Sequence, residues 1–542
     1  MQFEQLCSNN LKSLLLGVSA LALTASAASA DYIQTLGLGQ KTSSLAGAVT
    51  ATADDFDAFY TNPAGAANFT TPVIGLAVKL IDTTNLEIND GAGGGVKDTW
   101  AGEALATAPA LGAYLPVMPG SIVMGIGIGA PYALAADFND QNFGNTVTND
   151  HSSNIELLYL EAVPTIAVKL NERFNIGVGV NIGLAKHLKE TIKFTNLAGA
   201  NIDGTLLAQT DDDMPLPVAP WEFSTDPTAV TFTLGMQYQV LPNLKFGATY
   251  RAETANEFEG DVRLYTDFQN IAAILGAGAL TPLVCQNLGP AGTPDSCGLE
   301  RFRTTIELPR HLKLGLTWQA MENWELSFDA MWTNWSDAAG FGSDLIINLT
   351  QSQNGPNNMG GPLAGATGSP GGGAGLQGLL CQLAAVVGPG ACGINQIVVT
   401  AGAQDTMQYS FGSKYDLNNS LSLLAGYSFD EQFMPNKTQN LIFPSSDRHW
   451  VTGGVELKVP SAMGLWKLNL GGQVIFYEEN TISNSLNAGG LGPTAQVGNI
   501  AGPQVGGAAN AITLGSQTNP YEIDGHLWTV GMGATLFLGA TE

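Results

Sequence analysis

Four of the five cysteines have the spacing of local disulfides. Cys285 and Cys297 form one close pair, and Cys381 and Cys392 form another, each within a stretch rich in Gly and Pro. In an exported protein this spacing favours two local disulfides that close loops. No histidine lies near either pair, so the pattern does not predict a zinc site, and we expect no metal or other cofactor.

Catalytic groupings are hard to find in the sequence. It has no Gly-x-Ser-x-Gly elbow, and the adjacent His151 and Ser152 fall in a predicted loop. The few histidines have no serine partner on a predicted strand. We therefore do not expect an enzyme.

The elements that carry these residues must suit an unusual solvent. Hydrophobic residues make up 45% of the 542, and charged residues 13%, against roughly 25% charged in ordinary domains. Glycine is abundant, at 66 residues, and after the N-terminus there is no apolar run long enough for a membrane-spanning helix. This combination indicates a β-rich protein that meets a membrane.

The net charge of −26 argues against a nucleic-acid partner, which would require basic patches. The N-terminus resembles a secretory signal: Lys12 precedes an apolar core at residues 14–23, and Ala28-Ser29-Ala30 fits the cleavage rule. We therefore expect residues 1–30 to be a signal peptide.

Residues 54–68, DDFDAFYTNPAGAAN, follow this segment and do not form a strand pattern. Asn62-Pro63 is a turn signal, because proline fixes its own φ and restricts the residue before it. The small residues from Ala64 to Ala67 allow close backbone packing. We predict that residues 31–71 form a plug, which we call the hatch, inside a barrel formed by residues 72–542.

Segments of alternating polarity recur from the hatch to the C-terminus. In residues 324–332 the apolar set is Trp324, Leu326, Phe328, Ala330 and Trp332, and the last segment, residues 528–538, repeats this pattern. A period of two places apolar side chains on one face of a sheet. In a sandwich that face meets a second sheet, whereas in an outer-membrane barrel it meets lipid and the polar or glycine face lines the lumen.

Connection lengths decide between these two folds. Short connections alternate with long ones, as expected when short turns lie on the periplasmic side and long loops lie outside. The short ones are residues 117–121, 171–173, 241–243, 321–323, 418–420 and 461–464, and the long ones are residues 86–107, 139–154, 195–227, 267–303, 348–403, 431–448 and 483–524. The sequence therefore predicts an all-β, antiparallel transmembrane barrel of about 14 strands.

Several short stretches, spread over the chain, resemble the outer-membrane long-chain fatty-acid transporter family (FadL-type) and its hydrophobic-compound channels. They are Asn62-Pro63-Ala64 and the opening LGLGQKTSSLAGAVTATADD, then ALAADF at 133–138, LPNLKFGATYRAE at 241–253, LPRHLKLGLTW at 308–318, MWTNWS at 331–336, SFDEQFMP at 428–435 and PSSDRHW at 444–450. Each is short, but together they keep the family's order and spacing.

The resemblance implies a 14-stranded barrel with an N-terminal hatch, and passive uptake of hydrophobic molecules, above all long-chain fatty acids. Ligand is captured by outer loops, enters an apolar pocket and leaves sideways at a kink in the third strand, and movement of the hatch gates that exit. Here that strand is residues 122–137, and Ala130-Pro131-Tyr132 is the candidate kink. Local chemistry independently favours a kink there, since proline cannot complete a central ladder and glycine permits a bulge. Asn62, Pro63 and Ala64 are the expected structural or gating residues.

A fatty acid would require a cation or hydrogen-bond donors for its carboxylate. Lys186, His187 and Lys189 lie near the outer end of the fifth strand, and Lys186 aligns with a basic position of the family. Alternation places Lys186 on the lipid-facing parity, so that a bulge must turn it inward, whereas His187 has the lumen parity. The second family cation, expected after Trp335-Ser336, is missing, and this leaves neutral hydrophobic compounds open as ligands.

Other functions remain open at this point. A porin for polar solutes would have charged lumen ladders and no plug, and an adhesin or receptor would use the long loops without a pocket. We expect a monomer in the bacterial outer membrane, in contact with its lipid, that takes up neutral hydrocarbons or, more in keeping with the family, long-chain fatty acids.

Overall fold

The computed structural model describes residues 37–82, 85–90, 99–101, 105–138, 152–194, 204–210, 229–266, 300–350, 394–399, 401–439, 445–482, 510–514 and 521–540. The signal-peptide prediction for residues 1–30 and the disulfide predictions for Cys285, Cys297, Cys381 and Cys392 lie outside these residues. Among the described residues, no helix has the length and hydropathy that a membrane span requires.

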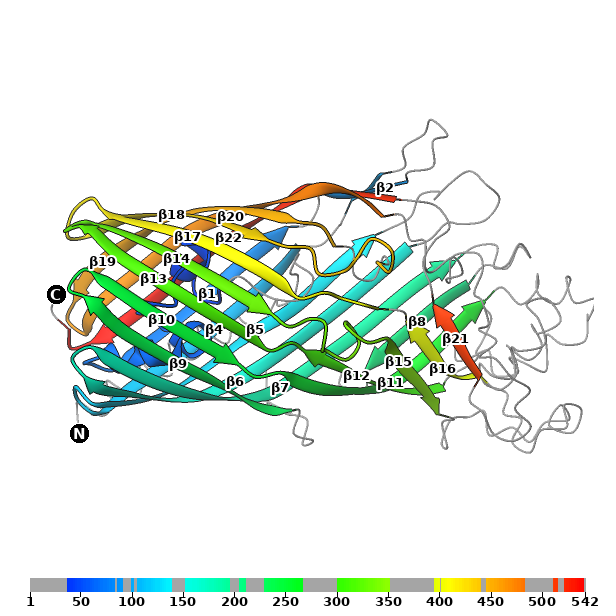
Figure 1. Ribbon diagram of the computed structural model, residues 1–542, viewed down its shortest axis with the longest axis horizontal. Coiled ribbons are helices and arrows are strands. Elements are labelled where there is room, and N and C mark those ends of the chain that lie inside the picture. Colours follow the sequence, from blue (N-terminus) through cyan, green and yellow to red (C-terminus); the bar gives the residue numbers. More distant parts are fainter. Residues whose placement is uncertain are drawn as a thin grey trace, which may run out of the picture.

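Fourteen strands of the described chain close into an antiparallel barrel (Figure 1). Each strand pairs with its neighbour in the chain, and the last pairs with the first. In order around the wall they are β1 (Val73–Asp82), β4 (Leu105–Met118), β5 (Ile122–Phe138), β6 (Ser152–Asn171), β7 (Phe174–Phe194), β9 (Val230–Leu241), β10 (Leu244–Arg251), β13 (His311–Met321), β14 (Trp324–Thr333), β17 (Thr406–Asp416), β18 (Leu421–Asp430), β19 (Arg448–Ser461), β20 (Gly464–Ile482) and β22 (Tyr521–Leu538). The predicted fold class is confirmed.

Further strands extend the wall at one end of the barrel, on the right in Figure 1. They pair with one another or with the barrel strands, and β16 and β21 pair in parallel. They are β2 (Leu86–Asp90), β3 (Thr99–Ala101), β8 (Gly204–Thr210), β11 (Thr254–Thr266), β12 (Glu300–Leu308), β15 (Leu345–Thr350), β16 (Ile394–Val399) and β21 (Asn510–Leu514). Part of what the sequence places in long loops is therefore sheet that stands above the barrel.

The period of two in the sequence divides each strand between lipid and lumen. On β13, Leu312, Leu314 and Leu316 are exposed on the outside, while His311 and Thr317 are buried. β14 repeats the division, with Phe328 outside and Asp329 inside. The outward apolar set is the face that lipid covers in an outer-membrane barrel.

The short turns lie at one end of the barrel, on the left in Figure 1, and the strand ends that lead into the long connections lie at the other. All six predicted short connections are turns in the structure: residues 119–121, 172–173, 242–243, 322–323, 417–420 and 462–463. We call the end with short turns the periplasmic end and the opposite end the outer end, following the usual orientation of such barrels.

The described part of the hatch, residues 37–71, lies inside the barrel near its periplasmic end (Figure 1). It contains two short helices, α2 (Gln40–Ser44) and α3 (Ala58–Thr61), and the 3₁₀ helix η2 (Pro63–Asn68). Nearly all its residues are buried, although many are polar. Buried polar groups require partners, and for the hatch these come from the barrel wall.

Candidate functional site

Asn62 connects the predicted hatch motif to the barrel wall. Its Oδ1 accepts a hydrogen bond from Ala64 N at 3.1 Å and so caps η2, which begins at Pro63. Proline suits this first helical position because its missing N–H would have no partner in the helix. The Asn62 Nδ2 group donates to Thr50 O at 2.7 Å and to Met236 O of β9 at 3.0 Å. Asn62 thus holds a helix start, a hatch loop and a strand together.

Two glycines of the wall make room for this motif. A Cβ atom at Gly235 of β9 would lie 2.1 Å from Asn62 Oδ1, and one at Gly177 of β7 would lie 2.3 Å from the carbonyl carbon of Pro63. Any side chain at either position would therefore push the hatch away from the wall. Alternation predicts a lumen face rich in glycine. The physical reason is this close contact, because the hatch leaves no space for a side chain.

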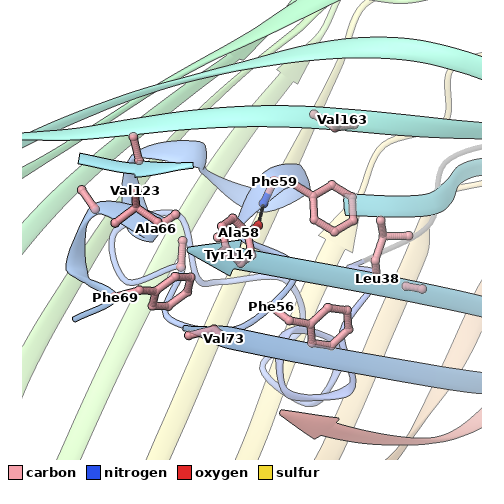
Figure 2. Close-up of a cluster of buried hydrophobic side chains, with 14 of the residues drawn as sticks. Leu38, Phe56, Ala58, Phe59, Ala66, Phe69, Val73, Tyr114, Val123 and Val163 are labelled. Atoms are coloured by element: carbon pink, nitrogen blue, oxygen red, sulfur yellow. Dashed lines mark hydrogen bonds between the residues drawn. The ribbon is translucent and has the colours of Figure 1, made fainter. Parts of the chain in front are cut away.

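Apolar side chains of the hatch pack against β1, β4, β5 and β6 (Figure 2). Leu38, Phe56 and Phe59 belong to this buried cluster, together with Val163 of β6 and Tyr114 of β4. The Tyr114 hydroxyl accepts a hydrogen bond from Phe59 N at 2.8 Å. The hatch therefore has an apolar side, and that side faces the strand predicted to kink.

On the other side of the lumen, polar groups anchor the hatch. Asp329 of β14 accepts hydrogen bonds from Val49 N at 3.1 Å, Thr50 N at 3.0 Å and Thr50 Oγ1 at 2.7 Å. Lys313 Nζ of β13 lies 3.4 Å from the same Asp329 carboxylate and donates to Gly47 O at 2.6 Å. Further side chains of the wall donate to carbonyl groups of the hatch, namely Gln237 to Thr52, Thr249 to Thr61, Thr452 to Ser44 and Gln473 to Ser43.

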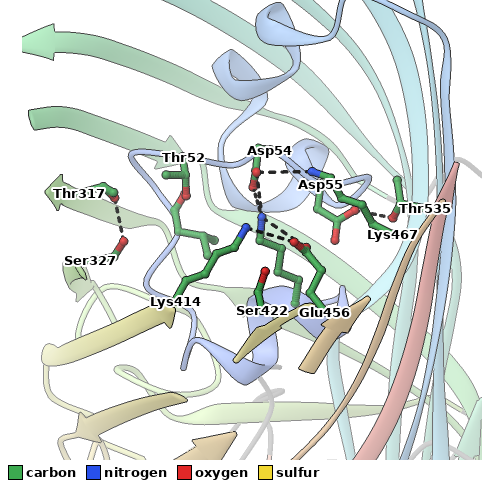
Figure 3. A network of polar contacts seen from close by, with 12 residues as sticks. Thr52, Asp54, Asp55, Thr317, Ser327, Lys414, Ser422, Glu456, Lys467 and Thr535 are labelled. Carbon is green, nitrogen blue, oxygen red and sulfur yellow. Dashed lines mark hydrogen bonds and ion pairs between the residues drawn. The ribbon is translucent and has the colours of Figure 1, made fainter. Parts of the chain in front are cut away.

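A network of charges joins the hatch to β17, β19 and β20 (Figure 3). Lys41 Nζ lies 2.6 Å from Asp54 Oδ1 and 3.9 Å from Glu456 Oε2, and Lys414 Nζ lies 3.1 Å from Glu456 Oε1. Lys467 Nζ completes the network at 3.8 Å from Asp54 Oδ2. Lys41 and Glu456 are buried and Asp54 is half-exposed, and the buried charges are paired, which is the condition for placing them away from water.

Three hatch carboxyl groups differ in their ionisation because their surroundings differ. Partial burial would raise the pKa of Asp54, but Lys41 and Lys467 hold that pKa well below its usual range. Burial raises the pKa of Asp55, which accepts from Thr535 Oγ1. Burial, and then the neighbouring Asp55, raise the pKa of Asp57 to about 6.

The predicted kink lies in β5, directly after the residues that contact the hatch and toward the outer end of the barrel. A Cβ atom at Gly127 would meet the ring of Phe59, and one at Gly129 would lie 2.7 Å from Leu38 Cδ1. The register with β6 then shifts: Gly129 pairs with Glu161, and Tyr132 pairs with Tyr159. Ala130 and Pro131 therefore face a single residue of β6, as in a β-bulge.

The other neighbour of β5 changes at the same point. β4 continues to Leu105, yet within the described residues its register with β5 ends at the pair Ala110–Gly129. β7 carries an extra residue between Gly183 and Ala185, opposite the step from Glu161 to Leu160 of β6. Irregularities in neighbouring strands thus gather at one level of the wall.

The predicted carboxylate ligands lie just beyond this level on β7. The backbone register pairs Lys186 with Tyr159 and His187 with Leu158. The extra residue before Ala185 is the kind of bulge that the sequence analysis required for Lys186. The side chains of Lys186 and His187 lie outside the described part of the chain, so their role stays a prediction.

Sequence reasoning missed a buried ion pair near the kink. Arg251, the last residue of β10, donates to Glu161 of β6 with Nη1 at 2.9 Å from Oε1 and with Nη2 to Oε2. The Arg251 guanidinium lies 5.7 Å from the ring centre of Tyr132. Charged residues on the lumen parity of β6 and β10 were the available signal, but alternation alone cannot pair residues on strands that are not neighbours.

Solved structures share this fold over most of the chain. A Pseudomonas aeruginosa FadL homologue is 14% identical with a TM-score of 0.61, and the match covers 93% of this chain and 99% of that one. The Pseudomonas putida toluene transporter TodX is 14% identical with a TM-score of 0.57, and the Ralstonia pickettii toluene transporter TbuX is 12% identical with a TM-score of 0.52. Each of the latter two matches covers 93% of this chain and 99% of the other.

At such low identity these neighbours show the fold alone, and no curated protein matches the sequence. The family described as outer membrane protein transport protein (OMPP1/FadL/TodX) matches residues 18–463. This match confirms the resemblance and the location in the bacterial outer membrane. Since the match covers most of its length, the chain belongs to the OMPP1/FadL/TodX family of outer-membrane transport proteins.

Proposed function

We propose that the protein takes up hydrophobic molecules passively and releases them sideways through the wall beside Ala130-Pro131-Tyr132. The observation that carries this proposal is the bulge in β5 directly outward of the hatch. There the β5–β6 register shifts, and within the described residues the β4–β5 register ends at the pair Ala110–Gly129. A hydrophobic molecule that reaches this level meets an irregular part of the wall before it meets the hatch.

Solvent physics favours this route over passage to the periplasmic end. An alkyl chain gains roughly 0.8 kcal/mol for each CH₂ that it buries. The periplasmic side of the hatch carries the network of Lys41, Asp54 and Glu456, in which apolar material has no partner. The outer side next to β5 carries Leu38 and Phe59 instead. Lateral exit leads from apolar contacts directly into lipid.

The anchoring of the hatch supports an exit that leaves most of the hatch in place. Polar contacts reach it from β9, β13 and β20 alike. A porin for polar solutes has no use for such a plug. Movement of the hatch as a gate stays a prediction, and Leu38, which lies against Gly129, is the hatch residue best placed to move.

For the ligand we propose a long-chain fatty acid or a neutral hydrocarbon. Fatty acids follow from the family resemblance, with Lys186 and His187 as the proposed partners of the carboxylate. Neutral hydrocarbons follow from the structural neighbours, since TodX and TbuX are toluene transporters and CymD is a monoaromatic hydrocarbon channel. CymD is 13% identical with a TM-score of 0.53.

Uptake by reconstituted protein tests the exit route. We expect the double variant Ala130→Val/Pro131→Val to restore a regular strand and to lower uptake of labelled fatty acid and alkylbenzene about tenfold, while equilibrium binding stays within twofold. Gly129 is kept, because a Cβ atom there would meet Leu38 at 2.7 Å. Pro460→Val, near the periplasmic end of β19, is the matched control and should leave uptake unchanged.

Two outcomes would contradict the proposal. Unchanged uptake by the double variant would remove the bulge in β5 from the route. High steady ion conductance of the wild-type protein in planar bilayers, without binding of either ligand, would instead establish a porin for polar solutes.

A further inference from the structure

Polar side chains form a row across the lumen face of five neighbouring strands. The register places Arg251 opposite both Thr233 of β9 and His311 of β13, His311 opposite Thr333 of β14, and Thr333 opposite Thr406 of β17. All five are buried. Paired residues of adjacent strands point to the same face of a sheet, so these side chains form a continuous polar strip on the lumen side.

Arg251 connects this strip to the kink through its ion pair with Glu161. β10 and β6 are separated in the wall by β9 and β7, so the ion pair between Arg251 and Glu161 must pass on the lumen side. Arg251 is 2% exposed and Glu161 is not exposed at all. The rings of Tyr132 and Tyr159 meet edge to face at 6.3 Å, beside the same guanidinium. A polar cluster therefore lies directly outward of the bulge at Pro131.

Among the side chains that the structure describes, the charge of this cluster is balanced. Arg251 is the cation and Glu161 its bidentate partner, which uses both carboxylate oxygens. A ligand carboxylate placed here would share Arg251 with Glu161, and two like charges in one buried place repel each other. An uncharged polar group meets no such opposition.

Two polar atoms, one in this cluster and one in the strip, lack a hydrogen-bond partner within the described part of the chain. They are the Tyr159 hydroxyl and His311 Nδ1, on side chains that are 1% and 6% exposed. A buried polar atom without a partner costs about 1–3 kcal/mol. Both can donate or accept, as hydroxyl oxygens and imidazole nitrogens do, and a neutral hydroxyl or carbonyl would serve either.

Apolar contacts begin one step from this cluster. Val163 lies two residues along β6 from Glu161 and belongs to the buried cluster with Leu38 and Phe59 (Figure 2). Polar and apolar partners thus adjoin each other at the level of the exit. Their arrangement matches a molecule with one polar end and an apolar body.

We infer that the protein prefers hydrophobic molecules with an uncharged hydrogen-bonding end, such as an alkylphenol or a long-chain alcohol, whose polar end meets the Tyr159 hydroxyl beside the Arg251–Glu161 pair. This inference rests on the proposed uptake function and narrows its ligand class. It places a specificity-determining site between the kink and the polar strip.

A matched ligand series tests the inference. 4-Nonylphenol, nonylbenzene and 4-nonylbenzoate share the same alkyl tail and differ in the end group. Displacement of a fluorescent hydrophobic probe from the purified full chain in one detergent gives a Kd for each. We expect the phenol to bind more tightly than the benzoate, and Tyr159→Phe to weaken phenol binding about threefold to tenfold while nonylbenzene is unaffected.

Tyr238→Phe is the control for the loss of a hydroxyl, because Tyr238 is 40% exposed on the outer face of β9. A second variant gives a gain of binding. Glu161→Gln keeps the shape of the side chain but leaves the charge of Arg251 unmatched, so benzoate binding should rise about tenfold. Such a gain is not expected from a variant that merely disturbs the fold.

Three results overturn the inference: tighter binding of benzoate than of phenol by the wild type, an unchanged ratio of phenol to nonylbenzene affinity in Tyr159→Phe, or no gain for benzoate in Glu161→Gln. Benzoate preference that disappears in Lys186→Met would assign the carboxylate to Lys186 instead. If none of the three ligands binds, the proposed uptake function itself fails, and this result is distinct from a wrong end-group preference.

Discussion

Asp329 shows how a single residue fixes the hatch. Its carboxylate receives two backbone N–H groups and the Thr50 hydroxyl, with Lys313 at 3.4 Å. Alternation along β14 predicts that Asp329 faces the lumen, but not that its partners lie about 280 residues away in the hatch. Sequence gives the direction of such a side chain, and tertiary packing gives its partner.

Removing this carboxylate should loosen the hatch. We expect Asp329→Ala to lower the free energy of unfolding by about 3 kcal/mol, because the change leaves two buried N–H groups and the Thr50 hydroxyl without their acceptor and removes the counter-charge of Lys313. Urea unfolding in lipid vesicles measures the loss, and hydrogen exchange should show faster exchange at Val49 and Thr50. The control Asp337→Ala removes an exposed partner of Arg310 and should cost less than about 1 kcal/mol. Equal losses in the two variants would contradict the anchoring role.

The raised pKa of Asp57 predicts how the stability of the hatch depends on pH. Its pKa is raised from 3.8 to about 6, by burial and by Asp55, while Gly39 N donates to it at 2.8 Å and Lys79 is a nearby cation. A carboxyl group with a higher pKa in the folded state binds its proton more tightly there. Its contribution to stability is therefore complete below pH 3.8 and is lost as the pH rises through about 6.

The urea midpoint of the wild type should accordingly be higher at pH 5 than at pH 8, and Asp57→Asn should reduce this difference. Asp55 shifts in the same direction, so a smaller pH dependence should persist in the variant. Asp337→Asn, at an exposed site, serves as the control and should keep the full difference. An Asp57→Asn protein with the wild-type pH dependence would show that another group titrates in this range.

Among the elements, η2 and β9 depend on each other through one close contact. Replacing Gly235 places a Cβ atom 2.1 Å from Asn62 Oδ1. We expect Gly235→Ala to displace the Asn62 cap and to cost about 1–3 kcal/mol in urea unfolding. Gly453→Ala is the matched control in β19, since its Cβ atom would have Leu424 O at 3.7 Å as its neighbour. A loss in Gly453→Ala as large as in Gly235→Ala would show that strand glycines matter here for backbone reasons alone.

The strands could be predicted from the sequence, but only some of their irregularities could. Alternation and turn signals locate the strands. Lipid on the outside favours apolar residues, whereas the hatch on the inside favours polar residues and glycine, so neighbouring residues of a strand differ. Pro131 indicates the bulge in β5 because proline cannot donate a hydrogen bond to the ladder of a sheet. The extra residue near Leu184 of β7 has no such signal, and it changes which residues beyond it share a face. The facing of Lys186 and His187 therefore cannot be read from sequence parity across this position.

At the scale of the whole molecule, the site depends on contacts between distant parts of the chain. The sequence predicts a plug and a barrel, and the structure places residues 37–71 inside the wall of fourteen strands. The pairing of Arg251 with Glu161 could not be predicted, because it joins strands that are not neighbours and depends on the curvature of the closed wall. The strip through His311 follows from the register, which alternation and turns already constrain.

A disulfide between the hatch and the wall distinguishes a hatch that stays in place during uptake from one that moves. A Cβ atom at Gly412 of β17 would lie 3.3 Å from Ala48 Cβ of the hatch, close to the roughly 3.5–4.5 Å of a disulfide. The pair Ala48→Cys/Gly412→Cys should therefore lock the hatch to the wall across the lumen from the kink. We expect uptake of alkylbenzene by the oxidised lock to equal uptake by the reduced form, because the ligand leaves through β5 and only the region of Leu38 needs to yield.

Peptide mapping by mass spectrometry confirms the lock and distinguishes it from the native cysteines, and the wild type treated with the same oxidant is the control. Uptake that falls on oxidation of the variant alone and returns with reductant would mean that the anchored part of the hatch must move. The polar contacts from β13, β19 and β20 would then have to break in each cycle. Each such buried contact contributes about 0.5–1.5 kcal/mol, so a moving hatch would have to overcome all of them together. Exit beside the bulge in β5 needs no such step, and this difference in cost is why we expect the locked protein to remain active.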